Sequence, residues 1–352
     1  MRLLRQFLLV LIFTFFAIEV AGLVFGNNGY FWFARQLYLS SGAIRPIGRE
    51  GLWTYAPNSN IIFAATYRLS SVESWVEYFC QFRTNRFGLI DTNYDQDRHQ
   101  TVDYLVLGDS FLEGHGGCPW LVRRSLPEGF PVVVNGGLQG ASIHTMELLD
   151  DWLSAQLNIR NVMLLVISND FKRMPPPAMW AARSECLVER RCKAGVDFVW
   201  ALPPDASEAK LARLSRHIPD QSRGDLWGQV SATLSYHSMS FNIVERFVKA
   251  LAGAQSVPNQ SEENAFTINF DALQRLRAKY PKLKLMMVPQ RDEVGVYGVE
   301  NRDTARVKRF LSEEHFGYKT CPLKLSDFMP IDGHPNAGGY QKLRECLNRE
   351  LQ

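Results

Sequence analysis

Four short apolar runs recur after residue 101, and each ends in glycine and polar residues. They cover residues 104–107, 132–134, 162–167 and 283–288. Amphipathic stretches such as residues 142–157 and 270–280 separate them. Apolar strands that alternate with helices are typical of a parallel sheet covered by helices on both faces. The pattern therefore predicts an α/β domain over residues 101–352, with ligands bound beyond the carboxyl ends of its strands.

The first 26 residues predict a membrane anchor. Arg2 and Arg5 precede residues 7–26, which are apolar except for Thr14 and Glu19. Twenty helical residues measure about 30 Å, the thickness of a bilayer's hydrocarbon core. Basic residues before the span predict a cytoplasmic N-terminus, with the following domain in the periplasm or at the cell surface. A cleaved signal peptide is the alternative, and it also exports the domain.

Two segments, one before the first apolar run and one after the third, do not show the alternation of strands and helices. Residues 27–100 mix aromatic residues with turn formers, and residues 61–63 and 76–82 read as strands of a small β-rich lead-in. Residues 171–265 interrupt the strand and helix alternation with a helical insertion that could form a lid or a substrate platform. Three tryptophans of this insertion could stack on sugar rings, although packing is the commoner role: Trp180, Trp200 and Trp227.

The cysteines fit an exported protein. The six are Cys80, Cys118, Cys186, Cys192, Cys321 and Cys346. None has the spacing of a zinc site, so no metal is expected. Two disulfides are plausible in an oxidising compartment, Cys186–Cys192 and Cys321–Cys346, the alternative being buried thiols.

The charge balance excludes one class of partner. The chain has 39 basic and 36 acidic residues, a formal net charge of +3. Nucleic-acid binding requires a concentrated basic face. We therefore expect no nucleic-acid partner.

Ser110 is the candidate nucleophile. It follows the first apolar run in the tetrapeptide Gly108-Asp109-Ser110-Phe111. A serine at a strand-to-helix turn lies where unpaired backbone N–H groups favour negative charge. Helix capping is the alternative role for such a serine.

Candidate oxyanion donors follow the second and third runs. Gly140 belongs to a glycine-rich segment after residue 134, and its backbone N–H has no side chain to obstruct it. Asn169 follows the third run, and its side-chain amide could donate a further hydrogen bond. With the Ser110 N–H, these groups would stabilise a developing oxyanion.

His334 is the candidate base, because it lies in a loop that proline fixes at the mouth of the last amphipathic helix. A carboxylate would orient its imidazole and stabilise the imidazolium. Asp332, two residues earlier, is the first candidate for this role, and Asp327 is the fallback.

Together, in this order and at these strand ends, the four segments resemble the SGNH/GDSL hydrolase superfamily over roughly residues 102–348. The resemblance implies a flavodoxin-like three-layer α/β/α sandwich and acyl hydrolysis or transfer without a cofactor. By position, Ser110 matches the nucleophile, Gly140 and Asn169 the oxyanion hole, and His334 the base. The chain departs from the pattern at Phe111, where leucine is usual, at Ile167, where glycine is frequent, and in the short spacing from Asp332 to the histidine. That spacing is similar to extracytoplasmic O-acetyltransferases of the alginate-modifying type.

These features predict a serine esterase or O-acyltransferase that acts on O-acetyl groups of cell-surface polysaccharide. A transferase would need a multi-span membrane partner to supply its acyl donor, because one span cannot carry acetyl across the bilayer. A lipase or thioesterase for membrane lipids is one alternative. The other is a non-catalytic protein that binds or assembles glycans on the same scaffold.

Overall fold

The computed structural model of the chain describes thirteen segments, and every structural statement below refers to them. They are residues 2–25, 34–40, 43–47, 52–68, 74–90, 101–114, 118–121, 130–173, 199–202, 206–214, 260–294, 299–329 and 333–352. Several sequence predictions lie outside them: the Cys186–Cys192 bridge, Trp180 and Trp227, and the carboxylate of Asp332.

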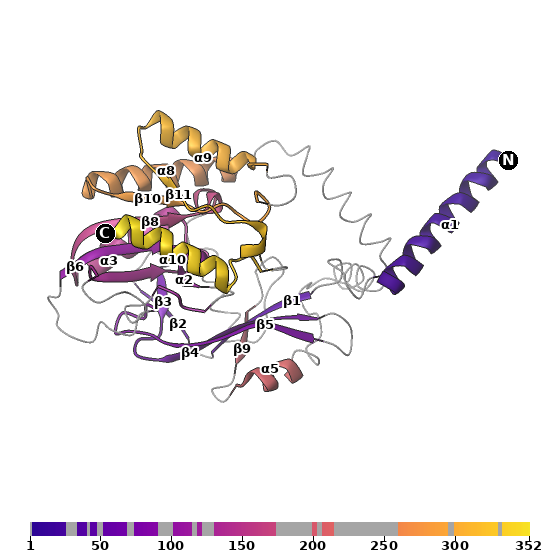
Figure 1. The fold of residues 1–352 in the computed structure, drawn as a ribbon, viewed down its shortest axis with the longest axis horizontal. Coiled ribbons are helices and arrows are strands. Elements are labelled where there is room, and N and C mark those ends of the chain that lie inside the picture. Colours follow the sequence, from indigo (N-terminus) through magenta and orange to yellow (C-terminus); the bar gives the residue numbers. More distant parts are fainter. Residues whose placement is uncertain are drawn as a thin grey trace.

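A five-stranded parallel sheet forms the centre of the α/β domain, between two layers of helices (Figure 1). Its strands are β6 (Thr101–Gly108), β7 (Val133–Gly137), β8 (Asn158–Val166), β10 (Lys284–Met287) and β11 (Lys319–Thr320). The spatial order β11-β10-β8-β6-β7 corresponds to the doubly wound order 2-1-3-4-5 read from the other edge. The chain reverses its direction of winding between β6 and β8, which makes their carboxyl ends the expected ligand site.

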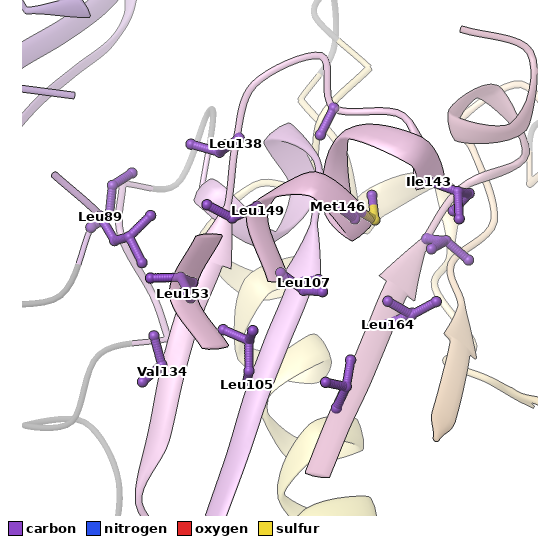
Figure 2. Close-up of a cluster of buried hydrophobic side chains, with 14 of the residues drawn as sticks. Leu89, Leu105, Leu107, Val134, Leu138, Ile143, Met146, Leu149, Leu153 and Leu164 are labelled. Atoms are coloured by element: carbon purple, nitrogen blue, oxygen red, sulfur yellow. The ribbon is translucent and has the colours of Figure 1, made fainter. Parts of the chain in front are cut away.

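Helices cover both faces of this sheet, as the alternation of apolar runs predicts. On one face lie α3 (Ile143–Ser154), α8 (Gln260–Lys279) and α9 (Arg302–Glu313). On the other lie α2 (Ser110–Glu113) and α10 (Ala337–Leu351). Leu105 and Leu107 face the first layer, as Figure 2 shows, whereas Val106 faces the second. Both faces of β6 are therefore buried, which explains its uninterrupted apolar run.

A second, four-stranded sheet has the order β5-β4-β1-β9. It combines β1 (Ala34–Ser40), β4 (Asn60–Arg68) and β5 (Ser74–Arg83) with β9 (Val199–Leu202), which pairs parallel to β1. Two further elements belong to this part of the fold. One is a short antiparallel pair, β2 (Ile44–Pro46) with β3 (Trp53–Tyr55), and the other is helix α5 (Glu208–Leu214). The strands predicted at residues 61–63 and 76–82 lie within β4 and β5. The insertion thus contributes a strand to the sheet of the lead-in, which its sequence did not indicate.

Three contacts attach the lead-in to the α/β core. The disulfide Cys80–Cys118 links β5 to the segment after α2. The Tyr55 hydroxyl donates a hydrogen bond to the buried carboxylate of Glu113 on α2. The Phe87 ring meets the Trp152 ring of α3 edge-on at 6.0 Å. These contacts and a shared apolar cluster make the lead-in a structural support of the helix that carries Ser110.

Helix α1 (Arg2–Phe25) covers the segment predicted to anchor the chain, and several of its large apolar side chains are exposed. Within the described segments, no helix combines the length and the apolar character needed to cross a membrane. The anchor stays a prediction.

Candidate active site

Ser110 and His334 lie side by side, although 224 residues separate them. Ser110 is the first residue of α2, directly beyond the carboxyl end of β6. His334 lies in the loop before α10. Its Nε2 atom is 2.8 Å from Ser110 Oγ, and Ser110 is only 5% exposed. A hydroxyl within hydrogen-bond distance of an imidazole nitrogen is the arrangement of a nucleophile with its general base.

Ser110 does not cap the helix. The capping residue is Asp109, whose Oδ1 accepts a hydrogen bond of 2.9 Å from the Phe111 N–H. The hydroxyl of Ser110 is therefore available to His334. Helix α2 has only four residues, so its dipole supplies less of the positive potential at Ser110 than the sequence suggested.

Aromatic packing orients the histidine. The Phe111 ring lies 5.2 Å from the imidazole, centroid to centroid. The Phe111 carbonyl accepts a hydrogen bond of 3.0 Å from Trp120 Nε1, and the Trp120 ring packs 5.6 Å from Tyr340 of α10. Leucine is usual at position 111 in the pattern that the sequence resembles. The phenylalanine of this chain packs against the imidazole of His334.

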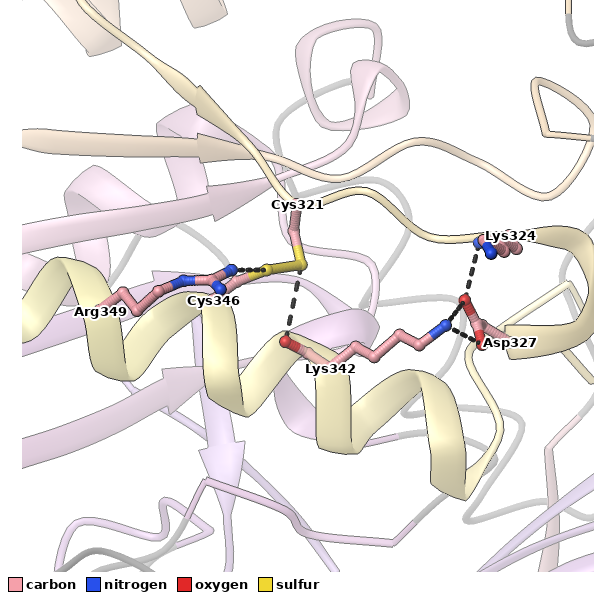
Figure 3. Close-up of a disulfide and its surroundings, with 6 residues drawn as sticks. All are labelled: Cys321, Lys324, Asp327, Lys342, Cys346 and Arg349. Carbon is pink, nitrogen blue, oxygen red and sulfur yellow. Dashed lines mark hydrogen bonds and ion pairs between the residues drawn. A yellow bond between two sulfur atoms is a disulfide. The ribbon is translucent and has the colours of Figure 1, made fainter.

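Backbone hydrogen bonds and a disulfide hold the loop of His334. The His334 carbonyl accepts a bond of 2.7 Å from the Met329 N–H. Asn336 caps α10 by accepting from the Gly339 N–H at 3.1 Å. Cys321 and Cys346 form the predicted disulfide, which attaches α10 to the chain just after β11 (Figure 3).

The fallback carboxylate, Asp327, points at α10. Both of its oxygens lie 2.7 Å from Lys342 Nζ, and Oδ2 also accepts from the Lys324 N–H (Figure 3). Burial works to raise the pKa of Asp327, but these hydrogen bonds outweigh it and hold the pKa below its usual value. This arrangement stabilises the loop and gives Asp327 no hydrogen bond to His334, so Asp332 stays the predicted orienting residue.

Gly140 lies in the turn between β7 and α3. Its φ of +70° is a left-handed conformation that favours glycine. Ser142 caps α3 by accepting from the Thr145 N–H. Earlier in the same segment, buried Asn135 donates to the carbonyls of Leu112 and Leu121 and so ties the end of β7 to α2.

Asn169 lies in a single 3-10 turn, Ser168–Phe171, directly after β8. Within this turn, Asp170 Oδ2 accepts a hydrogen bond of 3.0 Å from the Ile167 N–H. Gln290, which follows β10, donates to Ser168 Oγ at 2.7 Å. Because β8 pairs directly with β6, the turn of Asn169 neighbours that of Ser110 at the reversal point of the sheet.

Sequence reasoning missed a buried charged group next to Ser110. Asp109 and Asp170 are both fully buried, and Arg173 forms an ion pair with each. The available signal was the pair of aspartates at two adjacent strand ends, because buried carboxylates require a cation. Elsewhere in the described segments, no cluster of three histidine, cysteine, aspartate or glutamate residues is arranged to hold a metal ion.

Comparisons with known proteins identify no family. No family model matches the chain, and no curated protein does. Among solved structures, one similar chain, from Streptococcus pneumonia, has a title that relates it to platelet activating factor, with 13% identity, a TM-score of 0.30, and coverage of 72% of this chain and 85% of that one. Another is a carbohydrate esterase described as having divergent catalytic and non-catalytic binding functions, with 10% identity, a TM-score of 0.31, and coverage of 91% and 98%. Likenesses this remote do not define a function.

Proposed function

We propose that the chain is a serine esterase or O-acyltransferase of the SGNH type, with Ser110 as nucleophile and His334 as general base. The observation that carries this proposal is the 2.8 Å contact between Ser110 Oγ and His334 Nε2 at the reversal point of a doubly wound sheet. The sequence resemblance supports it independently, because it names the same two residues.

The reaction would have two steps. His334 takes the proton of Ser110 while the serine oxygen bonds to the ester carbonyl carbon, which generates a tetrahedral oxyanion. The N–H groups of Ser110 and Gly140 and the side-chain amide of Asn169 are the proposed oxyanion donors. The carbon–oxygen bond to the alcohol then breaks, and His334 returns the proton to the leaving oxygen. Water or a sugar hydroxyl attacks the acyl-serine and releases the acid or a new ester.

The substrate class in this proposal is O-acetylated polysaccharide outside the cytoplasm. The export-type N-terminal sequence and the disulfides Cys80–Cys118 and Cys321–Cys346 support an oxidising compartment. Acyl transfer in that compartment would draw its donor from a multi-span membrane partner. A series of 4-nitrophenyl esters tests the acyl group: preference for acetate supports the proposal, and preference for long chains supports the lipid alternative.

The decisive experiment is active-site labelling with a fluorophosphonate probe, which reacts only with an activated serine. Wild type, Ser110→Ala and His334→Ala should be compared, with the labelled peptide identified by mass spectrometry. We expect modification at Ser110 in the wild type and a rate at least ~10²-fold lower in His334→Ala. Labelling of Ser110 that is independent of His334, or no labelling of folded wild type, would refute the proposal.

A further inference from the structure

Two carboxylates are buried together beside the candidate nucleophile. Asp109 and Asp170 have no exposed surface, and Asp109 Oδ2 lies 3.4 Å from Ser110 Oγ. Burial, followed by the nearby charge of Asp109, raises the pKa of Asp170 well above its usual value, and Arg173 counteracts this rise. Such a pair is costly unless a cation compensates it.

Arg173 provides this cation, and one of its nitrogens reaches three segments. Its Nη1 lies 2.9 Å from Asp109 Oδ2, 2.6 Å from Asp170 Oδ1 and 3.0 Å from the Ala141 carbonyl oxygen. These acceptors follow β6, β8 and β7 in turn. Each stands next to a proposed participant in the reaction: Asp109 beside Ser110, Asp170 beside Asn169, and Ala141 beside Gly140. The three strand ends thus share one guanidinium.

The backbone of Arg173 is fixed in turn by α8. Asn269, a fully buried residue of that helix, donates 2.9 Å to the Arg173 carbonyl and 3.0 Å to the Phe171 carbonyl. Its Oδ1 accepts from the His144 N–H at the start of α3. Two helices of the first layer therefore hold the backbone at Arg173.

The charge of Arg173 has a chemical consequence at Ser110. In acyl transfer, negative charge develops on the serine oxygen and then on the former carbonyl oxygen. An uncompensated carboxylate next to that oxygen would repel this charge, and it would also compete with His334 for the serine proton. The contact of Asp109 Oδ2 with Arg173 reduces both effects.

We propose that Arg173 is a positioning residue that sets the relative placement of the nucleophile and the oxyanion donors and neutralises Asp109 beside Ser110. This inference rests on the proposed function and adds to it a residue outside the four matched sequence segments. Arg173 acts through Asp109, Asp170 and Ala141.

Other charged groups on the surrounding elements have their own partners. They are Lys172 with Asp303 of α9, His144 with Glu147 of α3, Glu113 of α2 with Tyr55, Glu263 of α8 with Arg306 of α9, and Asp327 with Lys342 of α10. His334 faces Ser110. Lys172→Met is a matched control. This substitution removes one positive charge from the neighbouring position and leaves the contacts of the buried carboxylates intact.

The test compares Arg173→Met, Arg173→Lys and Lys172→Met with the wild type. Fluorophosphonate labelling rates are measured from pH 5 to 9, kcat and KM with 4-nitrophenyl acetate, and folding by circular dichroism. We expect Ser110 of Arg173→Met to be labelled about 10²-fold more slowly. The fold-change in kcat should be larger than the fold-change in KM. The acidic limb of its profile should move to higher pH, because removal of a positive charge from the site favours the protonated forms of the groups that remain. Arg173→Lys should be intermediate, and Lys172→Met should stay within about fivefold of wild type.

Two failures can be told apart. If wild type labels in a His334-dependent manner but folded Arg173→Met has the same rate and the same acidic limb, the role of Arg173 is refuted and the proposed function stands. If wild type does not label, the proposed function fails and the role of Arg173 falls with it. Should Arg173→Met not fold, Arg173→Lys decides on the placement role, because a lysine variant with the wild-type rate would show that the guanidinium is not required to place these groups.

Discussion

The Phe111 ring packs against the imidazole of His334, with 5.2 Å between the ring centroids. The residue after the candidate nucleophile therefore forms a wall for the candidate base. The Phe111 carbonyl is fixed by Trp120, and Trp120 packs on the helix that follows His334. Trp120 thus ties the residue that packs on the imidazole to the helix that follows His334.

Removal of the Phe111 ring should leave the imidazole of His334 less precisely placed. We expect Phe111→Ala to lower kcat for 4-nitrophenyl acetate by about tenfold or more, because a misplacement of a catalytic group by about 1 Å can cost about 10²-fold. Phe111→Leu should retain more activity, since leucine still covers the ring. Steady-state kinetics checks both variants, and equal activity of Phe111→Ala and wild type would contradict the assigned packing role.

Gly140 should tolerate no side chain without loss of activity. At φ +70°, an alanine has a strained backbone that costs about 1–2 kcal/mol. If the backbone changes its conformation to relieve this strain, the N–H group of residue 140 would turn away from the proposed oxyanion. We expect Gly140→Ala to slow Ser110 labelling by about 10²-fold. Gly317→Ala is the control, because a Cβ there meets nothing within 4 Å. Labelling of Gly140→Ala at the wild-type rate would remove Gly140 from the oxyanion hole.

The Cys321–Cys346 bridge should stabilise the part of the fold that carries His334. Its sequence separation of 25 residues suggests a contribution of about 2–4 kcal/mol to the free energy of unfolding. We expect Cys321→Ser with Cys346→Ser to show this loss in urea titrations. The double variant Cys80→Ser with Cys118→Ser measures the loss of the other disulfide for comparison, and it should also lower stability, because that bridge ties the lead-in to the segment after α2. An unchanged midpoint in the first variant would refute the stabilising role.

The ion pair between Asp327 and Lys342 predicts a pH-dependent contribution to stability. The pKa of Asp327 is lower in the folded chain than its ordinary value of 3.8. A depressed carboxyl pKa stabilises the fold above the ordinary value, and the contribution is lost as the pH falls through the lower folded value. Lys342→Met should therefore be less stable than wild type at pH 7, with a smaller difference at an acidic pH well below 3.8. Urea midpoints at the two pH values measure this, and a difference that is undiminished in acid would exclude the ion pair as its cause.

The sequence predicted the elements that follow a strong hydrophobic period. Strands β6, β7, β8 and β10 and helices α3 and α8 overlap the predicted segments, because buried strands and amphipathic helices leave regular apolar patterns. Strand β11 was missed, since its two residues are both exposed. Strand β9 was missed because its partner, β1, lies about 160 residues earlier, as the pairing of Leu37 with Val199 shows. Local patterns carry no information on such a pairing.

The sequence predicted those site residues that can be recognised from their place beside a strand or helix end. Ser110 and His334, named from their positions in the sequence, are adjacent in the structure. The Cys321–Cys346 bridge was anticipated, whereas Cys80–Cys118 was not, because nothing near either cysteine indicates that the lead-in packs on α2. Arg173 was missed because its role depends on side chains from three separate turns.

The parallel pairing of β1 with β9 has a consequence for biosynthesis. During translation, β1 emerges from the ribosome long before residues 199–202, so the edge that β9 later occupies stays open in the nascent chain. An open edge is a template for pairing with other strands. The chain must therefore be kept from premature association until more than half of it has been made, and chaperone dependence should concentrate in that interval.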